Sequence, residues 1–175
     1  MSLTFSTVGV IGAGTMGAGI AQVAAQAGCR VKLFDAHEGA AAAASAKTAA
    51  TLNALAGKGK ITAEAATATI SRLSAAPDLA DFHDCDLIVE AIVENLDAKR
   101  TLFKSLEGIC AASTVLATNT SSISITAIAA GLARPENVVG MHFFNPAPLM
   151  ALVEVVMGQQ TAVTVAERVE AACAE

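Results

Sequence analysis

Residues 7–17 read TVGVIGAGTMG, and this stretch decides the fold. A short apolar strand (residues 7–11) leads into a G-x-G-x-x-G loop, after which the apolar spacing becomes helical over residues 16–28. The loop consists of Gly12, Ala13, Gly14, Thr15, Met16 and Gly17. Its first glycine permits the tight turn, the second lets the backbone approach a pyrophosphate, and the third lets the helix pack on the strand. Because the unpaired amides at a helix N-terminus attract phosphate, the stretch predicts a dinucleotide site.

Asp35 lies 18 residues after Gly17, at the end of the next predicted strand, residues 31–35. A carboxylate at this place binds the adenine ribose hydroxyls and repels the 2′-phosphate of NADP, so the sequence favours NAD as the cofactor. Two alternatives stay open. FAD binds to the same fingerprint, or the glycines make only a tight turn while Asp35 caps a helix.

Length and composition exclude several classes of protein. The chain has 175 residues and a formal charge of −5, which fits one domain over residues 1–175. No basic cluster exceeds the pair Lys99-Arg100, so no nucleic-acid partner is expected. Six glycines interrupt the uncharged residues 1–29, so no membrane span is expected. The spacing of the four cysteines fits no zinc-binding pattern, so no metal site is expected. We interpret them as small, reduced core residues of a cytoplasmic protein: Cys29, Cys85, Cys110 and Cys173.

Strands and helices alternate along the rest of the chain. The predicted strands cover residues 7–11, 31–35, 86–92, 114–118, 138–142 and 152–156, and the predicted helices cover residues 16–28, 40–55, 62–73, 97–110, 123–130 and 162–175. This alternation predicts an α/β fold of the Rossmann type, a doubly wound, mostly parallel sheet with helices on both faces. The last helix stops without a glycine, a proline or a polar tail, which we interpret as truncation inside a larger protein.

Four further segments carry a more specific signal, since a dinucleotide fingerprint does not identify a reaction. They are VEAIVEN at residues 89–95, NTSS at 119–122, HFFNP at 142–146 and LVE at 152–154. In this order they resemble the 3-hydroxyacyl-CoA dehydrogenase family, and the likeness runs from about Ser6 to the last residue. The resemblance implies oxidation of the 3-hydroxyl of an acyl-CoA thioester to the 3-oxoacyl-CoA, with hydride transfer to NAD.

By motif, the resemblance makes His142 the general base, Glu154 its partner, and Ser121 a hydrogen-bonding contact of the substrate oxygen beside the nicotinamide. These residue types suit the chemistry. Hydride transfer from C3 requires loss of the hydroxyl proton, an imidazole takes up protons near neutral pH, and a carboxylate fixes its tautomer. Alternatives stay open here too: a lone histidine after a strand is more often structural, and Ser121 also suits a cap for the helix that begins near Ile123.

The resemblance implies a further set of binding residues: Glu94, Lys99 and Asn145 at the cofactor, and Lys58 or Lys60 at the CoA phosphates. All of them except Asn145 have an alternative explanation. Glu94 also suits the N-terminus of the following helix, Lys99 also suits a solvated helix face, and the other two lysines suit solvated loop positions better than a CoA site. We interpret His37 and His83 as surface residues, because both lie in polar connections.

The family continues beyond this length into an all-helical domain that forms the homodimer and supplies an asparagine and much of the acyl pocket. We therefore expect these residues to bind NAD with little or no turnover. Ala151 stands where the family carries a lysine. Residues 122–128, SISITAI, resemble bacterial members of short-chain or phenylacetate catabolism. Two other functions stay open: a non-catalytic structural member of the family, or a dehydrogenase of another hydroxy acid.

Overall fold

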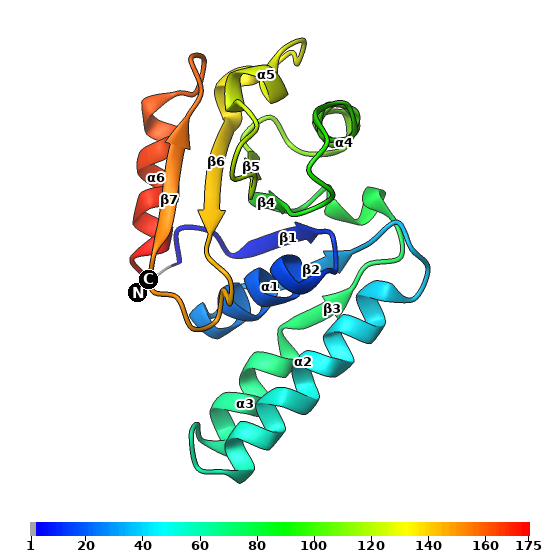
Figure 1. The fold of residues 1–175 in the computed structure, drawn as a ribbon, viewed down its shortest axis with the longest axis vertical. Helices are drawn as coiled ribbons and strands as arrows, with labels where there is room; N and C mark the ends of the chain where they lie inside the picture. The colour runs from blue at the N-terminus through cyan, green and yellow to red at the C-terminus, as the bar shows by residue number, and fades with distance from the viewer. Residues whose placement is uncertain (1–2) are drawn as a thin grey trace.

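The computed structural model describes residues 3–175. Within them, seven strands form one sheet in the order β3-β2-β1-β4-β5-β6-β7. The strands are β1 (Thr7–Ile11), β2 (Arg30–Phe34), β3 (Leu73–Ala75), β4 (Leu87–Glu90), β5 (Val115–Thr118), β6 (Val138–Phe143) and β7 (Val153–Met157). Neighbouring strands are parallel except β6 and β7, which pair antiparallel (Figure 1). The predicted Rossmann-type, mostly parallel sheet is confirmed.

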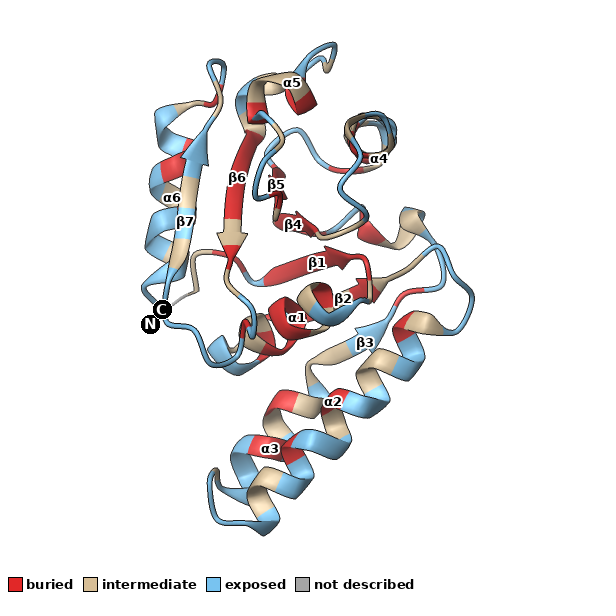
Figure 2. Ribbon diagram, viewed as in Figure 1, coloured by how far each residue is buried: buried red, intermediate tan, exposed pale blue. Residues whose placement is uncertain are grey.

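Helices cover both faces of this sheet, as predicted. One core lies between the sheet and the helices α1 (Thr15–Ala27) and α6 (Val163–Cys173), where Ile20 and Val169 are fully buried. The other core lies under α4 (Leu96–Ile109) and α5 (Ile125–Ala129), where Phe103 and Ile128 are fully buried. Because helices cover both faces, β1, β4 and β5 are buried along their whole length, which explains their continuous apolar runs (Figure 2).

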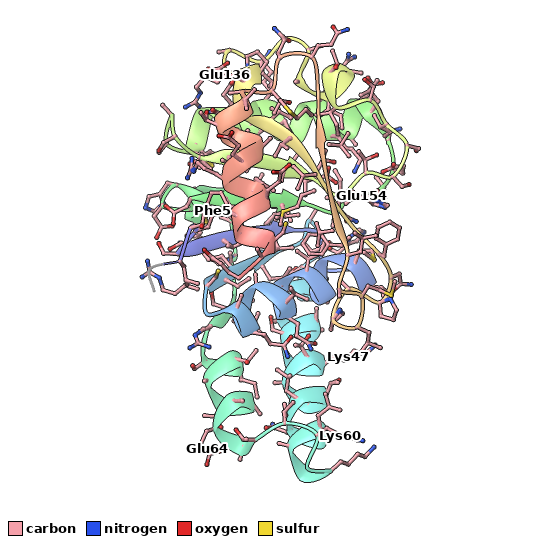
Figure 3. All side chains as sticks on the ribbon, turned by 90° about the vertical axis from the view of Figure 1, so that its left-hand side faces the viewer. Phe5, Lys47, Lys60, Glu64, Glu136 and Glu154 are labelled. Atoms are coloured by element: carbon pink, nitrogen blue, oxygen red, sulfur yellow. The ribbon has the colours of Figure 1, made fainter. Side chains whose placement is uncertain are left out.

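Two helices extend away from the sheet as a pair. α2 (Ala40–Gly57) and α3 (Ala63–Ser71) pack against each other and project from the body of the domain (Figure 3). Leu52 of α2 is fully buried. Thr62 caps α3, accepting a hydrogen bond from the amide of Ala65 at 3.1 Å.

Two predictions about this part of the chain and its end are wrong. The helix predicted over residues 62–73 ends at Ser71, and Leu73 begins β3, which pairs with Val31 and Leu33 of β2. A strand of three residues is too short to show a period of two, so the sequence pattern did not separate it from the helix. Cys173 is exposed near the end of α6, whereas the other three cysteines are buried and all four are free thiols.

Throughout residues 3–175, every helix is too short or too polar to cross a membrane. Two short 3-10 helices, η1 (Leu79–Phe82) and η2 (Pro135–Asn137), complete the connections before β4 and β6.

Candidate active site

The glycine loop leaves the N-terminus of α1 open to a ligand. Gly12 has a φ angle of 102°, which a residue with a side chain rarely adopts, and this turns the chain sharply after β1. α1 begins after Gly14 with no side-chain cap and no acidic residue in its first turn. A Cβ at Gly14 would stand in open space, so the glycine leaves room at the helix end. These features fit a pyrophosphate bound by backbone amides.

Asp35 follows β2 and faces the glycine loop. Its Oδ2 accepts a hydrogen bond from the amide of Ala13 at 2.7 Å, and its Oδ1 accepts one from the amide of His37 at 2.9 Å. Burial favours the neutral acid, but these hydrogen bonds and the nearby His37 imidazole outweigh burial and hold the pKa of Asp35 below its ordinary value. The side chain of Asp35 is therefore ionised at neutral pH, as recognition of ribose hydroxyls requires.

The surface beside Asp35 is hollowed. A cavity of about 480 Å³ lies between this residue and the segment Ala75, Ala76 and Pro77, which includes the end of β3. The strand that the sequence analysis missed thus forms one wall of the hollow where the adenine half of a dinucleotide is expected. The His37 side chain is 92% exposed here, and His83 is exposed elsewhere, so both surface assignments are confirmed.

His142 and Glu154 lie side by side on one face of the sheet. They are directly paired residues of the antiparallel strands β6 and β7, so their side chains point the same way. The imidazole Nδ1 lies 2.8 Å from Oε2 of the carboxylate. The His142 side chain is 20% exposed and the ring of Phe144 lies 4.7 Å away, centroid to centroid. The contact of Nδ1 with Glu154 fixes the orientation of the imidazole and leaves Nε2 as the nitrogen that can exchange a proton with a ligand.

Ser121 shares a hollow with this pair. The hollow measures about 320 Å³ and is lined by His142, Glu154 and the loop that follows β5, residues 120–126. Ser124, not Ser121, caps α5, because its side chain accepts the hydrogen bond from the amide of Ala127. The capping alternative for Ser121 is therefore wrong, and its side chain stays exposed at the mouth of the hollow.

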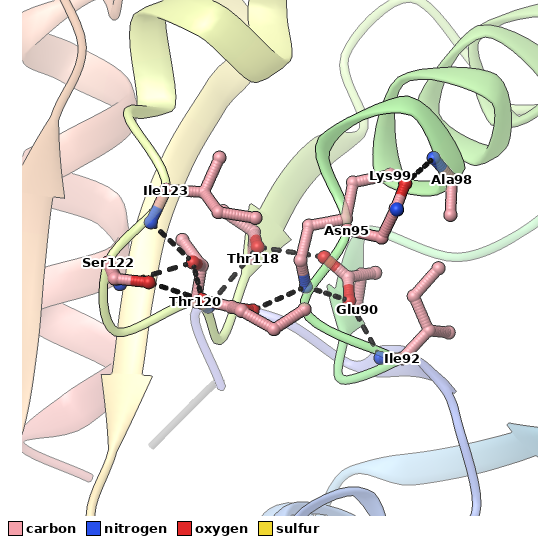
Figure 4. A network of polar contacts seen from close by, with 10 residues as sticks. Glu90, Ile92, Asn95, Ala98, Lys99, Thr118, Thr120, Ser122 and Ile123 are labelled. Atoms are coloured by element: carbon pink, nitrogen blue, oxygen red, sulfur yellow. Dashed lines mark hydrogen bonds and ion pairs between the residues drawn. The ribbon is translucent and has the colours of Figure 1, made fainter.

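Lys99 is one of the most deeply buried side chains of the domain, so the solvated alternative for it is wrong. Its Nζ lies 2.6 Å from Oε1 of Glu90 and 3.3 Å from Oε2 of Glu94, and its side chain is only 1% exposed (Figure 4). Glu94 also accepts hydrogen bonds from the hydroxyls of Thr120 and, at 3.2 Å, Ser122. Burial alone would raise the pKa of Glu94, but these hydrogen bonds and the Lys99 charge lower it below its ordinary value.

Sequence reasoning missed Glu90, which is completely buried at the end of β4. A signal was available, because an acidic residue inside an apolar strand requires a counter-ion or several hydrogen-bond donors. It also missed a contact of Asn119, whose side chain accepts a hydrogen bond from the amide of Phe143 at 2.8 Å. This bond ties the loop after β5 to the strand that carries His142.

The remaining predicted residues separate into two places. Asn145 lines a hollow of about 660 Å³ beside the glycine loop, between α1 and α2, together with Lys47. Lys58 and Lys60 are exposed just after the end of α2, and neither lines this hollow. Figure 3 shows Lys60 at the far end of the helix pair, away from Lys47. Ala151 is exposed just before β7. Across residues 3–175, no three His, Cys, Asp or Glu side chains cluster as a metal site would require.

Comparison with known proteins identifies the family. A family model described as the NAD-binding domain of 3-hydroxyacyl-CoA dehydrogenase matches residues 7–175. The chain belongs to this family. The resemblance that the four segments indicate is thereby confirmed, and the Rossmann-type fold with its glycine loop is the fold of an NAD-binding domain of a 3-hydroxyacyl-CoA dehydrogenase.

Individual relatives agree with this assignment. The 3-hydroxyadipyl-CoA dehydrogenase of Escherichia coli is 49% identical over 168 residues, which are 96% of this chain and 35% of that protein. A probable 3-hydroxybutyryl-CoA dehydrogenase of Deinococcus radiodurans is 50% identical over 87% of this chain and 55% of its own length. The crystal structure of 3-hydroxybutyryl-CoA dehydrogenase from Escherichia coli superposes with a TM-score of 0.92 at 50% identity, covering 94% of this chain and 35% of that one. The chain thus spans about a third to about half of the length of these relatives.

Proposed function

We propose that this domain binds NAD at the carboxyl edge of its sheet and presents His142 as the general base for oxidation of a 3-hydroxyacyl-CoA. The observation that carries the proposal is the 2.8 Å contact between His142 and Glu154 in the hollow that Ser121 also lines. A base, its orienting acid and a hydroxyl donor at one edge of a dinucleotide-binding sheet suit a hydroxyl oxidation.

The protein's part in this chemistry is to move a proton and hold an oxygen in place. NAD, when bound, supplies the acceptor for the hydride. With Nδ1 engaged by Glu154, Nε2 of His142 takes the proton of the substrate hydroxyl, and the carboxylate stabilises the imidazolium that forms. Ser121 donates a hydrogen bond to the substrate oxygen. In the reverse direction, the imidazolium returns its proton to that oxygen.

The residues that would hold the cofactor follow the order of the strands. The amides of the loop Gly12, Ala13, Gly14, Thr15, Met16 and Gly17 would bind the pyrophosphate, and Asp35 would bind the adenine ribose. The nicotinamide half of the cofactor would be bound by Glu94, Lys99, Ser121 and Asn145. The open N-terminus of α1 and the ionised Asp35 support the first two of these assignments.

The substrate belongs to the proposal as well. The names of the relatives point to short-chain or dicarboxylic acyl-CoA substrates and to fatty acid oxidation. Phenylacetate catabolism is proposed only from the resemblance of residues 122–128 to bacterial members of the family. Lys58 and Lys60 are the proposed contacts of the CoA phosphates, at the end of the α2–α3 pair. We further propose a single NAD-binding domain over residues 1–175, of which the first two lie outside the described residues. A homodimer and a cytoplasmic location complete the proposal, and the free thiols support the latter.

The test uses two preparations. The 175-residue chain is titrated with NADH and with NAD, followed by fluorescence of the reduced cofactor and by competition. The full-length protein that carries it is assayed for NADH formation from 3-hydroxybutyryl-CoA. We expect binding by the chain, and loss of more than about 100-fold in kcat when His142 is replaced by Asn.

His83→Asn is the matched control, because that histidine is exposed and remote from the hollow. Full-length protein that binds NADH but oxidises no hydroxyacyl-CoA would favour the non-catalytic alternative. Faster oxidation of a free hydroxy acid than of its CoA thioester would favour the other hydroxy-acid dehydrogenase.

A further inference from the structure

Glu90 is completely buried, and both of its carboxylate oxygens accept hydrogen bonds. Oε1 accepts hydrogen bonds from Nζ of Lys99 at 2.6 Å and from the amide of Ile92 at 2.7 Å, and Oε2 accepts one from the hydroxyl of Thr118 at 2.8 Å. Burial of two charges is costly, and a pair of this kind often contributes less to stability than well-packed apolar residues would. Its position therefore calls for an explanation beyond stability.

That position is the switch point of the sheet. Glu90 is the last residue of β4 and pairs with Ile11, the last residue of β1, on one side and with Thr118, the last residue of β5, on the other. The chain order reverses between β1 and β4, and dinucleotides bind across this point at the carboxyl ends of the strands. Strands β4 to β6 then lie under the nicotinamide half of the proposed cofactor site.

The cluster connects Glu90 with the residues proposed to act there. Lys99 bridges Glu90 to Glu94, and Glu94 holds Thr120, whose hydroxyl accepts a hydrogen bond from the amide of Ile123 at 2.9 Å. These contacts brace the loop on both sides of Ser121 (Figure 4). The side chain of Lys99 is 1% exposed, and its ammonium is held between the carboxylates of Glu90 and Glu94.

The charges of the cluster do not balance. Two carboxylates share one ammonium, so the cluster carries one net negative charge. Lys99 is closest to the fully buried Glu90, and the member that reaches the surface is Glu94, whose side chain is 40% exposed. Oxidised nicotinamide carries a positive charge on its ring and reduced nicotinamide does not. A net negative charge beside the ring therefore favours the oxidised cofactor over the reduced one.

We propose that Glu90 is a positioning residue that keeps Lys99 turned inward as its counter-ion, so that the cluster presents a net negative charge that favours NAD⁺ over NADH. The inference rests on the proposed function, since it requires that the cofactor bind with its nicotinamide over β4 to β6. It adds to the proposed binding role of Lys99 an electrostatic one, exerted through Glu94.

The experiment compares dissociation constants of the two cofactor forms in the 175-residue chain. NADH is titrated by fluorescence, and NAD⁺ by competition with NADH. In Glu90→Gln the amide keeps the size of the side chain, while the cluster becomes neutral. We expect the ratio of the NAD⁺ to the NADH dissociation constant to rise several-fold, because the substitution removes a unit charge whose attraction only the oxidised ring experiences.

Glu94→Gln is the second variant, since it also makes the cluster neutral, and Glu94 is a partly exposed side chain whose replacement should disturb the fold less than that of the buried Glu90. The same direction of change is expected. Glu107→Gln is the control, because Glu107 is a largely buried carboxylate on the same helix, about 12 Å along its axis from Lys99, and pairs with Arg134. The ratio should not change in this control, even if its stability falls.

Three outcomes overturn the inference. The first is an equal change of both dissociation constants in Glu90→Gln and Glu94→Gln, which a purely structural role would give. The second is a ratio in Glu107→Gln that rises as much as in the cluster variants. In either case the proposed function stands, because the unsubstituted chain still binds. The third is an unsubstituted chain that binds neither form, which refutes the proposed function and this inference together.

Discussion

Replacement of Lys99 by Met should be among the most destabilising single changes at a charged residue of this domain. Methionine fills a similar volume but removes the ammonium that lies 2.6 Å from Glu90, a residue with no exposed surface. Removing one partner of a buried pair leaves the other charge without compensation, which typically costs 3–5 kcal/mol, so we expect a loss of about 4 kcal/mol in the free energy of unfolding. For a domain of this size that corresponds to a fall of roughly 10 °C in Tm.

The assay is urea and thermal unfolding followed by circular dichroism, with two companion variants. Lys104→Met is the matched control, because Lys104 is an exposed lysine of the same helix, and its loss should cost less than about 0.5 kcal/mol. The double variant Glu90→Gln with Lys99→Met removes both charges, so it should recover about half of the lost stability.

Two results would refute this reasoning. A cost below about 1 kcal/mol for Lys99→Met would mean that water or rearrangement compensates Glu90 without the ammonium. A double variant that is no more stable than Lys99→Met alone would mean that the two side chains are not coupled.

Three further perturbations test other parts of the structure. Asp35→Asn should weaken NADH binding about tenfold by fluorescence titration while NADPH binding weakens less, because the charge that repels a 2′-phosphate is gone. Gly140→Ala should cost about 1–3 kcal/mol in urea unfolding, since the added Cβ would lie 2.9 Å from Cβ of Val156 and 3.0 Å from Cδ1 of Ile125, whereas Gly108→Ala, in open space, should not. Partial burial of Asp86 raises its pKa, but hydrogen bonds from Ser6 and Thr7 outweigh burial, so the net pKa lies below the ordinary carboxyl value of 3.8. The ionised Asp86 therefore stabilises the fold fully above pH 3.8, and this stabilisation disappears as the pH falls through the depressed pKa. Asp86→Asn should therefore cost about 1–3 kcal/mol at neutral pH, and this cost should decrease progressively in unfolding curves as the pH falls below 3.8.

The fold was largely predictable because its signals are local. The glycine loop, the strand before it and the acid after the next strand all lie within residues 7–35, and strands buried on both faces give continuous apolar runs. β3 was missed because its three residues become a strand only by pairing with β2, which is a contact about 40 residues distant in sequence. Edge strands of this length carry little local information.

The site was predictable only where a motif carried it. His142, Glu154 and Ser121 come from segments that resemble a family, and the structure brings all three to one hollow. Lys99 illustrates the limit of reasoning from residue types. A lysine on an amphipathic helix is solvated by default. Lys99, however, precedes Phe103 by four residues and Leu106 by seven, so helical spacing alone places it on the buried face of α4. Its environment depends on Glu90, on a strand nine residues earlier, so only the packing of α4 on the sheet reveals the pair.

The contact between His142 and Glu154 depends on packing at the opposite face of the sheet. In β7, Val153 and Val155 face the core under α1 and α6, and they are opposite Phe143 and Met141 of β6. Glu154 alternates with them and so faces the other side, opposite His142. A slip of one residue in this pairing would bury the carboxylate in the apolar core and expose the valines, which is strongly unfavourable. Apolar burial on one face therefore fixes the register that aligns the acid with the imidazole on the other.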